Sequence, residues 1–137
     1  MQPEQRKVPF RERVSVDLRR AECERVQLCR PTHIPVILVC AGTSTPQCER
    51  EKFLLGKDVT VAQLSTIVRS YVQLRKHEAL FFLCDRTMLI GSDTMLELQH
   101  KYRDADDGFL YISYTLESVF GNDSLVRRNE QVTQHQK

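Results

Sequence analysis

The feature that most constrains the fold is an apolar run near the C-terminal end, Phe-Leu-Tyr-Ile-Ser-Tyr at 109–114. Its aromatic and β-branched side chains are typical of a buried β-strand. The preceding Asp107-Gly108 indicates a turn, because glycine readily adopts the positive φ that a tight turn requires. Residues 122–137 are mainly polar and charged and cannot bury enough apolar surface to fold. The folded part of the chain is therefore expected to end shortly after a buried strand.

A second buried strand is predicted at 34–40, where Ile-Pro-Val-Ile-Leu-Val-Cys is apolar on both faces. Pro35 fits best at the beginning of such a strand, since proline has no N–H to donate to the sheet. Between the two apolar strands we expect, in chain order, a strand at 52–55, a helix from residue 60, a strand at 79–84, a short segment at 88–90 and a helix at 94–102. The two apolar strands can lie side by side in the middle of a sheet, and only a crossover connection makes them parallel.

This order predicts an α+β fold of the ubiquitin-like β-grasp type, in which a mixed sheet wraps one amphipathic helix. Residues 60–63, Thr-Val-Ala-Gln, match a capping box at the start of that helix, and apolar residues then recur at helical spacing as far as Tyr71. An additional N-terminal helical layer is expected at 16–29, because Arg30 precedes a proline and avoids helical angles. The expected apolar face of this N-terminal helix consists of Val16, Leu18, Val26 and Leu28.

Length and charge set broad limits on function. The 137 residues leave room for one domain with a modest core. A net charge of +2 is too small to indicate nucleic-acid binding. No apolar run is long enough to span a membrane, and the N-terminus lacks the apolar core of a signal peptide. We therefore expect a cytoplasmic protein whose five cysteines stay reduced.

Three groupings of residues suggest enzymatic or metal chemistry, and none of them is complete. Cys29 and His33 could act as thiol nucleophile and base, but no third orienting group is evident. These two residues with Cys23 lack the paired Cys-x-x-Cys spacing of a zinc site. The acidic loop at 104–108 departs from a calcium loop at its glycine and final glutamate positions. We expect no catalytic residue, no metal and no cofactor.

Several motifs occur in the order of one known family. They are Arg-Arg-Ala-Glu-Cys-Glu-Arg-Val at 19–26, His-Ile-Pro-Val-Ile at 33–37, Lys-Phe-Leu at 52–54, Asp-Val-Thr-Val-Ala-Gln at 58–63, Ala-Leu-Phe-Phe at 79–82, Phe-Leu-Tyr-Ile-Ser-Tyr at 109–114 and Glu-Ser-Val-Phe-Gly at 117–121. In these motifs the chain resembles the autophagy ubiquitin-like modifiers, the family of GABARAP, from about Leu18 to Gly121. The Pro-Phe-x-x-Arg motif that opens the helical layer of this family corresponds either to residues 9–13 or, in altered form, to residues 15–19.

The resemblance implies a domain organisation of three parts. Residues 1–14 are an N-terminal extension, helical or disordered, and residues 15–121 are the ubiquitin-like domain with its N-terminal helix. Residues 122–137 are a disordered tail that proteolysis is expected to remove. The resemblance also implies that the protein is conjugated and is not itself an enzyme.

Conjugation in this family starts at a C-terminal glycine, here Gly121 after Phe120. The resemblance implies cleavage after Gly121 by an autophagy cysteine protease, followed by transfer through activating and conjugating enzymes to phosphatidylethanolamine. Glycine suits both steps, because without a Cβ it fits a narrow protease groove and leaves its carbonyl open to thiolate attack. Two fatty chains then hold a soluble domain on a membrane. The implied location is the cytoplasm, and the autophagosome membrane after lipidation.

The second implied activity is docking of an extended aromatic-x-x-aliphatic peptide, which adds as a strand beside 52–55 and connects cargo receptors to the membrane. Carried over by position, the pocket for the aromatic residue comprises Glu22, Val26, Pro35, Ile37, Lys52, Leu54 and Phe109. The pocket for the aliphatic residue comprises Phe53, Leu55, Val59, Leu64 and Ile67. Arg50 and Lys52 would attract acidic residues that flank the motif. Ile37, Leu64 and Ile67 are equally well explained as core residues.

Four departures from the family pattern bear on selectivity. Gly56 replaces a usual proline, Tyr71 and His33 replace usual arginines, and Glu51 places an acid in a normally basic run. We therefore expect weaker or altered motif selectivity. An alternative function is a ubiquitin-like adaptor that binds such motifs but is never conjugated and keeps its tail.

Overall fold

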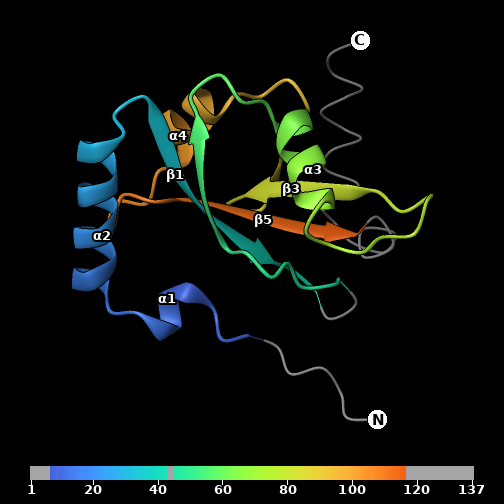
Figure 1. The fold of residues 1–137 in the computed structure, drawn as a ribbon, viewed down its shortest axis with the longest axis horizontal. Coiled ribbons are helices and arrows are strands. Elements are labelled where there is room, and N and C mark those ends of the chain that lie inside the picture. The colour runs from blue at the N-terminus through green and yellow to red at the C-terminus, as the bar shows by residue number, and fades with distance from the viewer. Residues whose placement is uncertain (1–6, 43–44, 117–137) are drawn as a thin grey trace.

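The computed structural model describes residues 7–42 and 45–116. Its helices and strands are α1 (Phe10–Arg13), α2 (Val16–Cys29), β1 (His33–Cys40), β2 (Lys52–Gly56), α3 (Val61–Arg69), β3 (Leu80–Cys84), β4 (Thr87–Met88), α4 (Met95–Tyr102) and β5 (Leu110–Leu116). The predicted elements are present in the predicted order. Figure 1 shows α2 on one side of the sheet and α3 on the other.

The sheet has the strand order β2-β1-β5-β3-β4. β1 and β5 pair in parallel in its middle, and the three remaining pairings are antiparallel. This arrangement confirms the predicted mixed sheet with its two most apolar strands at the centre. Pro35 is accommodated because the pairing of β1 with β5 begins one residue later, at Val36 opposite Leu110.

The inner face of the sheet carries the main hydrophobic core. Both helices on this side begin with a capping box, in which Thr60 pairs with Gln63 and Thr94 pairs with Glu97. The fully buried members of the core come from α3, α4 and the central strands. Those with 0% exposure are Ile34, Leu64, Val68, Met95, Leu110 and Ile112. The 3.6-residue period of α3 and the apolar strands therefore specify this side of the fold.

The outer face carries a smaller cluster formed by Phe10, Cys23, Ile37 and Phe109. Phe10 enters from α1, and its ring meets the ring of Phe109 edge to face at a centroid distance of 5.5 Å. Pro9-Phe10 thus fills the position that the Pro-Phe motif was expected to fill, and Val16 in the competing segment is 36% exposed. Helix α1 lies within the region that we assigned to an extension.

The predicted apolar face of α2 is wrong. Cys23 is the only buried residue of this helix, whereas Leu18 is 65% exposed and Leu28 is 84% exposed. Helix α2 is attached to the domain mainly by polar contacts. Arg19 Nε donates to the fully buried carboxylate of Asp107 at 2.9 Å, and the same arginine donates to the carbonyl of Val14 at 2.6 Å. The ion pair and hydrogen bonds of Arg19 therefore hold α2 against the outer face, whereas apolar burial holds the helices on the inner face.

Candidate functional site

Strand β2 forms one edge of the sheet, and its backbone hydrogen-bonding pattern shows which groups are open. Leu38 N–H donates to the carbonyl of Glu51 at 2.7 Å, and the register places Val36 opposite Phe53. In an antiparallel ladder these alternate positions bond to the partner strand, so Lys52 and Leu54 direct their N–H and C=O groups away from β1. This open edge can accept another strand.

The residues predicted for an aromatic pocket lie on the outer side of this edge. The sheet register places Pro35 opposite Leu54 and Ile37 opposite Lys52. Lys52 Nζ lies 2.9 Å from a carboxylate oxygen of Glu22, which joins β2 to α2, and Val26 is one helical turn further along α2. Phe109 packs in the same cluster as Ile37. The structure therefore brings this set together.

The residues predicted for the aromatic pocket divide into buried residues at its base and more exposed residues at its rim. Pro35, Ile37 and Phe109 are buried. Glu22, Val26 and Leu54 are half-buried, and Lys52 is exposed. Phe10 also borders the set, since Lys52 Nζ lies 5.0 Å from the centroid of its ring. Phe10 was not among the residues predicted for the site, although the Pro9-Phe10 motif was its signal.

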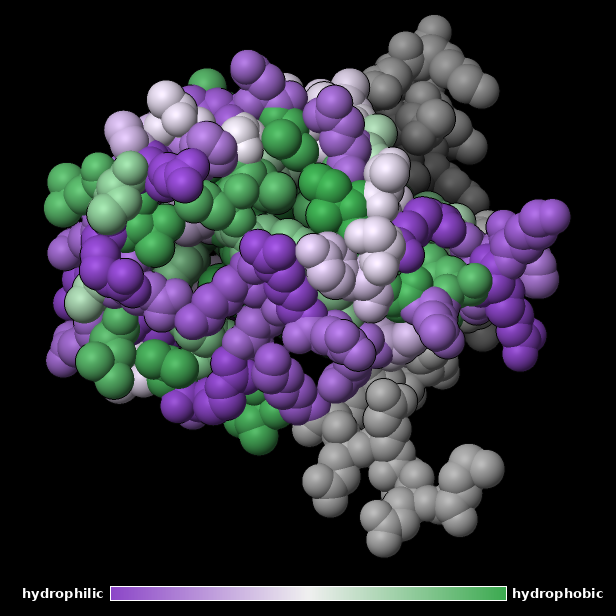
Figure 2. All heavy atoms as spheres, in the orientation of Figure 1, coloured by the Kyte–Doolittle hydropathy of each residue, from purple (hydrophilic) through white to green (hydrophobic). Residues whose placement is uncertain are grey.

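The residues predicted for an aliphatic pocket lie on the inner side, between β2 and α3. Leu64 is fully buried, and Phe53 and Leu55 are 5% and 7% exposed, so these three are core residues. Val59 and Ile67 are half-buried and pack against the core. Figure 2 shows hydrophobic side chains between β2 and α3, with hydrophilic side chains at their borders. Val59 and Ile67 are therefore the members of this set best placed to contact a peptide.

Arg50 is fixed beside this second set. Its Nε donates to the carbonyl of Lys52 at 2.8 Å, and its Nη1 donates to the hydroxyl of Tyr71 at 3.2 Å. Its guanidinium carbon lies 4.9 Å from the centroid of the Phe53 ring. The rings of Phe53 and Tyr71 meet at a centroid distance of 5.9 Å. Tyr71 thus closes a cluster of one cation and two aromatic rings at the edge.

Glu51 does not face the open edge. Its carboxylate accepts from Arg13 of α1 and lies 3.9 Å from Lys7 Nζ. These cations neutralise Glu51 on the side of the N-terminal layer. The acid that departs from the basic run of the family therefore does not place its carboxylate at the open edge.

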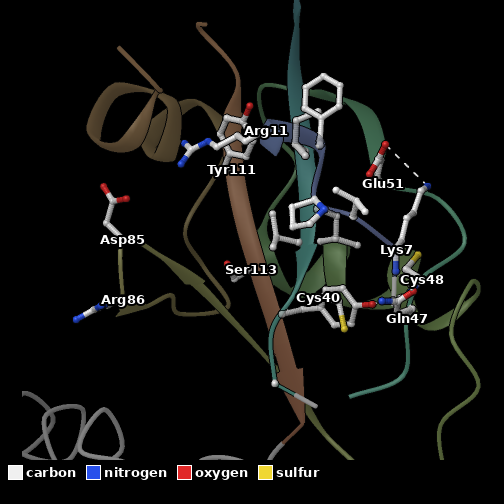
Figure 3. A pocket seen from close by; sticks show the side chains of 18 residues that line it. Lys7, Arg11, Cys40, Gln47, Cys48, Glu51, Asp85, Arg86, Tyr111 and Ser113 are labelled. Atoms are coloured by element: carbon white, nitrogen blue, oxygen red, sulfur yellow. Dashed lines mark hydrogen bonds and ion pairs between the residues drawn. The ribbon is translucent and has the colours of Figure 1, made fainter. Parts of the chain in front are cut away.

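A cavity of about 650 Å³ lies next to α1 on the outer face of β1 and β5. Figure 3 shows Lys7 directed toward Glu51, Arg11 lying over Tyr111, and Asp85 and Arg86 on the opposite side. Arg11 is 3.8 Å from the centroid of the Tyr111 ring and also forms an ion pair with Asp104. This cavity could not be predicted from sequence patterns, because its lining comes from segments far apart in the chain.

The two buried thiols, Cys23 and Cys84, are poor candidates for nucleophiles. Burial raises the pKa of Cys23 to about 11 and the pKa of Cys84 to about 12, so both are protonated at neutral pH. Among the residues that the structure describes, no group of three or more histidine, cysteine, aspartate or glutamate side chains could hold a metal ion. Within the same residues, no helix combines the length and apolar character needed to span a membrane.

The topology and the parallel central strands define a ubiquitin-like protein with an added helical layer. The profile of the family described as "Autophagy protein Atg8 ubiquitin like" matches residues 18–121. The chain belongs to this Atg8 family of autophagy ubiquitin-like proteins.

Individual relatives agree with this membership. Autophagy-related protein 8 of Mycosarcoma maydis is 34% identical over 82% of this chain and 95% of its own length. Microtubule-associated protein 1 light chain 3 gamma of Homo sapiens is 34% identical over 82% of this chain and 78% of its own length.

Two solved structures share the fold. The crystal structure of Trypanosoma brucei ATG8 has a TM-score of 0.75 and 30% identity, and the match covers 82% of this chain and 97% of that one. Plasmodium falciparum Atg8, solved in complex with a Plasmodium falciparum Atg3 peptide, has a TM-score of 0.70 and 23% identity, with coverage of 80% and 96%. The predicted resemblance and the predicted fold are confirmed. The expected cleavage position, Phe120-Gly121, lies outside the described residues.

Proposed function

We propose that this protein is a lipid-conjugated autophagy modifier that recruits proteins bearing aromatic-x-x-aliphatic motifs. The observation that carries the docking part is the open edge of β2, with outward-facing backbone groups at Lys52 and Leu54. One partly exposed apolar set lies on each side of this edge, and Arg50 and Lys52 supply positive charge beside it. An extended peptide would pair with the backbone and place one side chain in each set.

The conjugation part rests on family membership and on Gly121, the position expected for cleavage. We propose that a cysteine protease removes residues 122–137 and that activating and conjugating enzymes transfer Gly121 to phosphatidylethanolamine. Intact mass and the C-terminal peptide, measured on protein isolated from its own starved cells beside a Gly121→Ala form, test this step. We expect a chain that ends at Gly121, part of it carrying a phospholipid, and no such chain in the variant.

The same experiment separates the two candidate functions. A chain that ends at Lys137 in every fraction would leave an unconjugated adaptor as the function. The docking edge supports this adaptor equally, since pairing of a peptide with β2 does not involve the C-terminus.

Docking itself is tested by titration calorimetry with an aromatic-x-x-aliphatic peptide. Leu54→Pro removes an outward N–H from the edge, so we expect it to abolish binding. Leu18→Ala, which changes an exposed side chain of α2, is the control and should bind as the parent does. Retention of a folded thermal transition by Leu54→Pro is required for the comparison.

A further inference from the structure

We propose that the cavity on the outer face binds a medium-chain fatty acid, with the acyl chain along β1 and β5 and the carboxylate at the positively charged rim. The inference depends neither on peptide docking nor on conjugation, so it goes beyond the proposed function. The volume of about 650 Å³ is in the range of cavities that bind small molecules. Such cavities combine an apolar lining with a few polar groups that orient the ligand.

The first observation is that the apolar outer face of the central strands is only partly covered. The register places Val39 of β1 beside Ser113 of β5. Both are half-buried and line the cavity, as Tyr111 does, and these three residues form its base. Ile37, two residues earlier in β1, is 1% exposed because it packs in the cluster of Phe10. A strand that is apolar on both faces normally has a layer against each face, and at Val39 an apolar ligand would complete the outer layer.

The second observation is that one wall of the cavity is anchored, so the space exists before a ligand enters. This wall is the segment 7–10 at the start of the N-terminal layer. The backbone N–H of Lys7 donates to Gln47 Oε1 at 3.2 Å, and Arg13 Nη1 donates to the carbonyl of Val8 at 2.8 Å. Phe10, at the end of the wall, is 3% exposed. A preformed cavity binds its ligand without the cost of ordering the chain around it.

The third observation is that the rim carries a surplus of positive charge. Three cations and two carboxylates line the cavity, and Figure 3 shows Lys7 and Arg86 on opposite sides of it. Lys7 Nζ lies 3.9 Å from Glu51, whose carboxylate is also paired with Arg13 outside the lining. The side chain of Arg86 forms no hydrogen bond or ion pair with any residue that the structure describes. A carboxylate at the rim therefore meets positive charge that the protein does not neutralise.

The length of the cavity limits the chain that it can hold. The lining follows β1 over residues 37–40, which is about 10 Å at the rise of a strand. A long-chain fatty acid would leave its end in water, and a phospholipid would bring a second chain that also needs an apolar surface. Decanoate is therefore the probe for this site.

Titration calorimetry with a series from hexanoate to dodecanoate tests the acyl site, using the full chain and concentrations at which the fatty acids are monomeric. Each added pair of methylenes should raise the affinity about tenfold for as long as it is buried. The gain should stop at decanoate, where the chain reaches the end of the cavity. An equal gain that continues to dodecanoate would indicate association with an open surface and would overturn the proposal.

Two variants at the base of the cavity test where the chain binds. Ser113→Phe places a ring in the cavity and should abolish binding of decanoate, and a thermal transition like that of the parent shows that the variant is folded. Val39→Thr keeps the shape of the side chain and adds a hydroxyl to the base, so it should weaken binding at least about threefold. Val16→Thr, the same change in α2 outside the cavity, should have no effect. Unchanged binding in Val39→Thr and in folded Ser113→Phe would overturn the proposal.

The carboxylate is tested by comparing decanoate with decanol, which is uncharged. The parent should bind decanoate more tightly, and Lys7→Gln combined with Arg86→Gln should weaken decanoate about threefold to tenfold and leave decanol unchanged. Lys57→Gln combined with Arg75→Gln removes the same charge from two exposed positions outside the lining and should change neither ligand. Equal weakening by the two double variants would mean that net charge attracts the ligand, and it would overturn the role of the rim.

Amide signals in a ¹⁵N spectrum locate the bound chain independently. Decanoate should shift the signals of residues 37–40 and 111–113 and leave those of β2 and α3 in place. Shifts confined to β2 and α3 would place the ligand in the peptide-docking site and would overturn the proposal. Binding to vesicles of anionic phospholipid without binding of monomeric decanoate would overturn it as well, because attraction to a bilayer needs only the surface charge.

Discussion

The two faces of the sheet are covered by helices in different ways. On the inner face, α3 and α4 pack through fully buried aliphatic side chains such as Leu64 and Met95. On the outer face, the buried cluster has four members among the residues that the structure describes, and α1 and α2 are attached largely through ion pairs that include Arg19 with Asp107. The inner face depends on buried area, which is not directional, and the outer face depends on a few specific contacts. The docking edge lies where the two faces meet.

The largest effect is expected from a truncation in the inner core. Leu110 is 0% exposed at the start of β5, so Leu110→Ala should lower the free energy of unfolding by about 3–5 kcal/mol and destabilise the whole domain. Urea denaturation followed by circular dichroism measures this loss. Leu18→Ala, at a 65% exposed position in α2, is the matched control and should change stability by less than about 0.5 kcal/mol. Similar losses in the two variants would remove the contrast between the faces.

The corresponding truncation on the outer face should act locally. Phe10 is 3% exposed and packs on Phe109, so Phe10→Ala should cost about 3 kcal/mol, the lower end for a buried phenylalanine, and release the helical layer while the sheet stays folded. Hydrogen exchange measured by mass spectrometry should show faster exchange in α1 and α2 and unchanged exchange in β1 and β5. Uniformly faster exchange would show that the two faces form one cooperative unit.

The same contrast explains what the sequence could predict. The inner face was predictable, because its packing depends on the burial of apolar side chains. That burial leaves local patterns in the sequence, namely the apolar period of α3 and the apolar runs of the strands. The face of α2 was not, because Leu18 and Leu28 suggest burial while Arg19 holds the helix through Asp107, which is 88 residues away. Contacts between distant charged residues leave no periodic signal.

At the β2 docking edge, too, the sequence predicted which residues come together but not how their side chains contact one another. The residues of the two predicted pockets were carried over by position, and the strand register brings them to one edge. The sequence showed Tyr71 as a substitution that removes positive charge, and only the structure shows that its hydroxyl holds Arg50 over the Lys52 carbonyl. The direction of the Glu51 side chain was not predictable for a similar reason, since its partner Arg13 belongs to a helix whose alignment was open.

Alkaline pH should affect both faces through one buried thiol on each. Burial raises the pKa of Cys23, on the outer face, from 9.0 to about 11 and that of Cys84, on the inner face, to about 12. A raised pKa in the folded state means that the folded protein holds the proton more tightly, so this stability is complete below pH 9 and decreases as the pH rises above it. Each thiol should account for a loss of about 1.4 kcal/mol by pH 10.

Urea denaturation at several pH values between neutrality and pH 10 measures this dependence. In Cys23→Ala and in Cys84→Ala, the free energy of unfolding should decrease less steeply with rising pH than in the parent protein, and by a similar amount in both. This expectation holds whatever the effect of each substitution on stability at pH 7. A flatter slope in Cys84→Ala alone would show that the outer cluster admits water around Cys23 and is not a true core.

The smallest effect is expected for the ion pair at the docking edge. Lys52 and Glu22 lie 2.9 Å apart, but their side chains are 48% and 24% exposed, so solvent and salt screen the attraction. A double-mutant cycle with Lys52→Met and Glu22→Gln should give a coupling energy of about 0.2–1 kcal/mol that decreases in high salt. Both variants keep most of the side-chain volume, so the cycle reports the charges and not the packing.

The outer face also offers a buried pair for comparison, in which the side chains of Arg19 and Asp107 are 11% and 0% exposed. The same cycle made with Arg19→Met and Asp107→Asn should give a larger coupling that changes little with salt, because buried charges are screened less. If the Lys52–Glu22 coupling were as large and as insensitive to salt, the edge would be a rigid part of the outer layer. A small, salt-sensitive coupling instead leaves Lys52 free to exchange Glu22 for a peptide carboxylate, as docking at this edge requires.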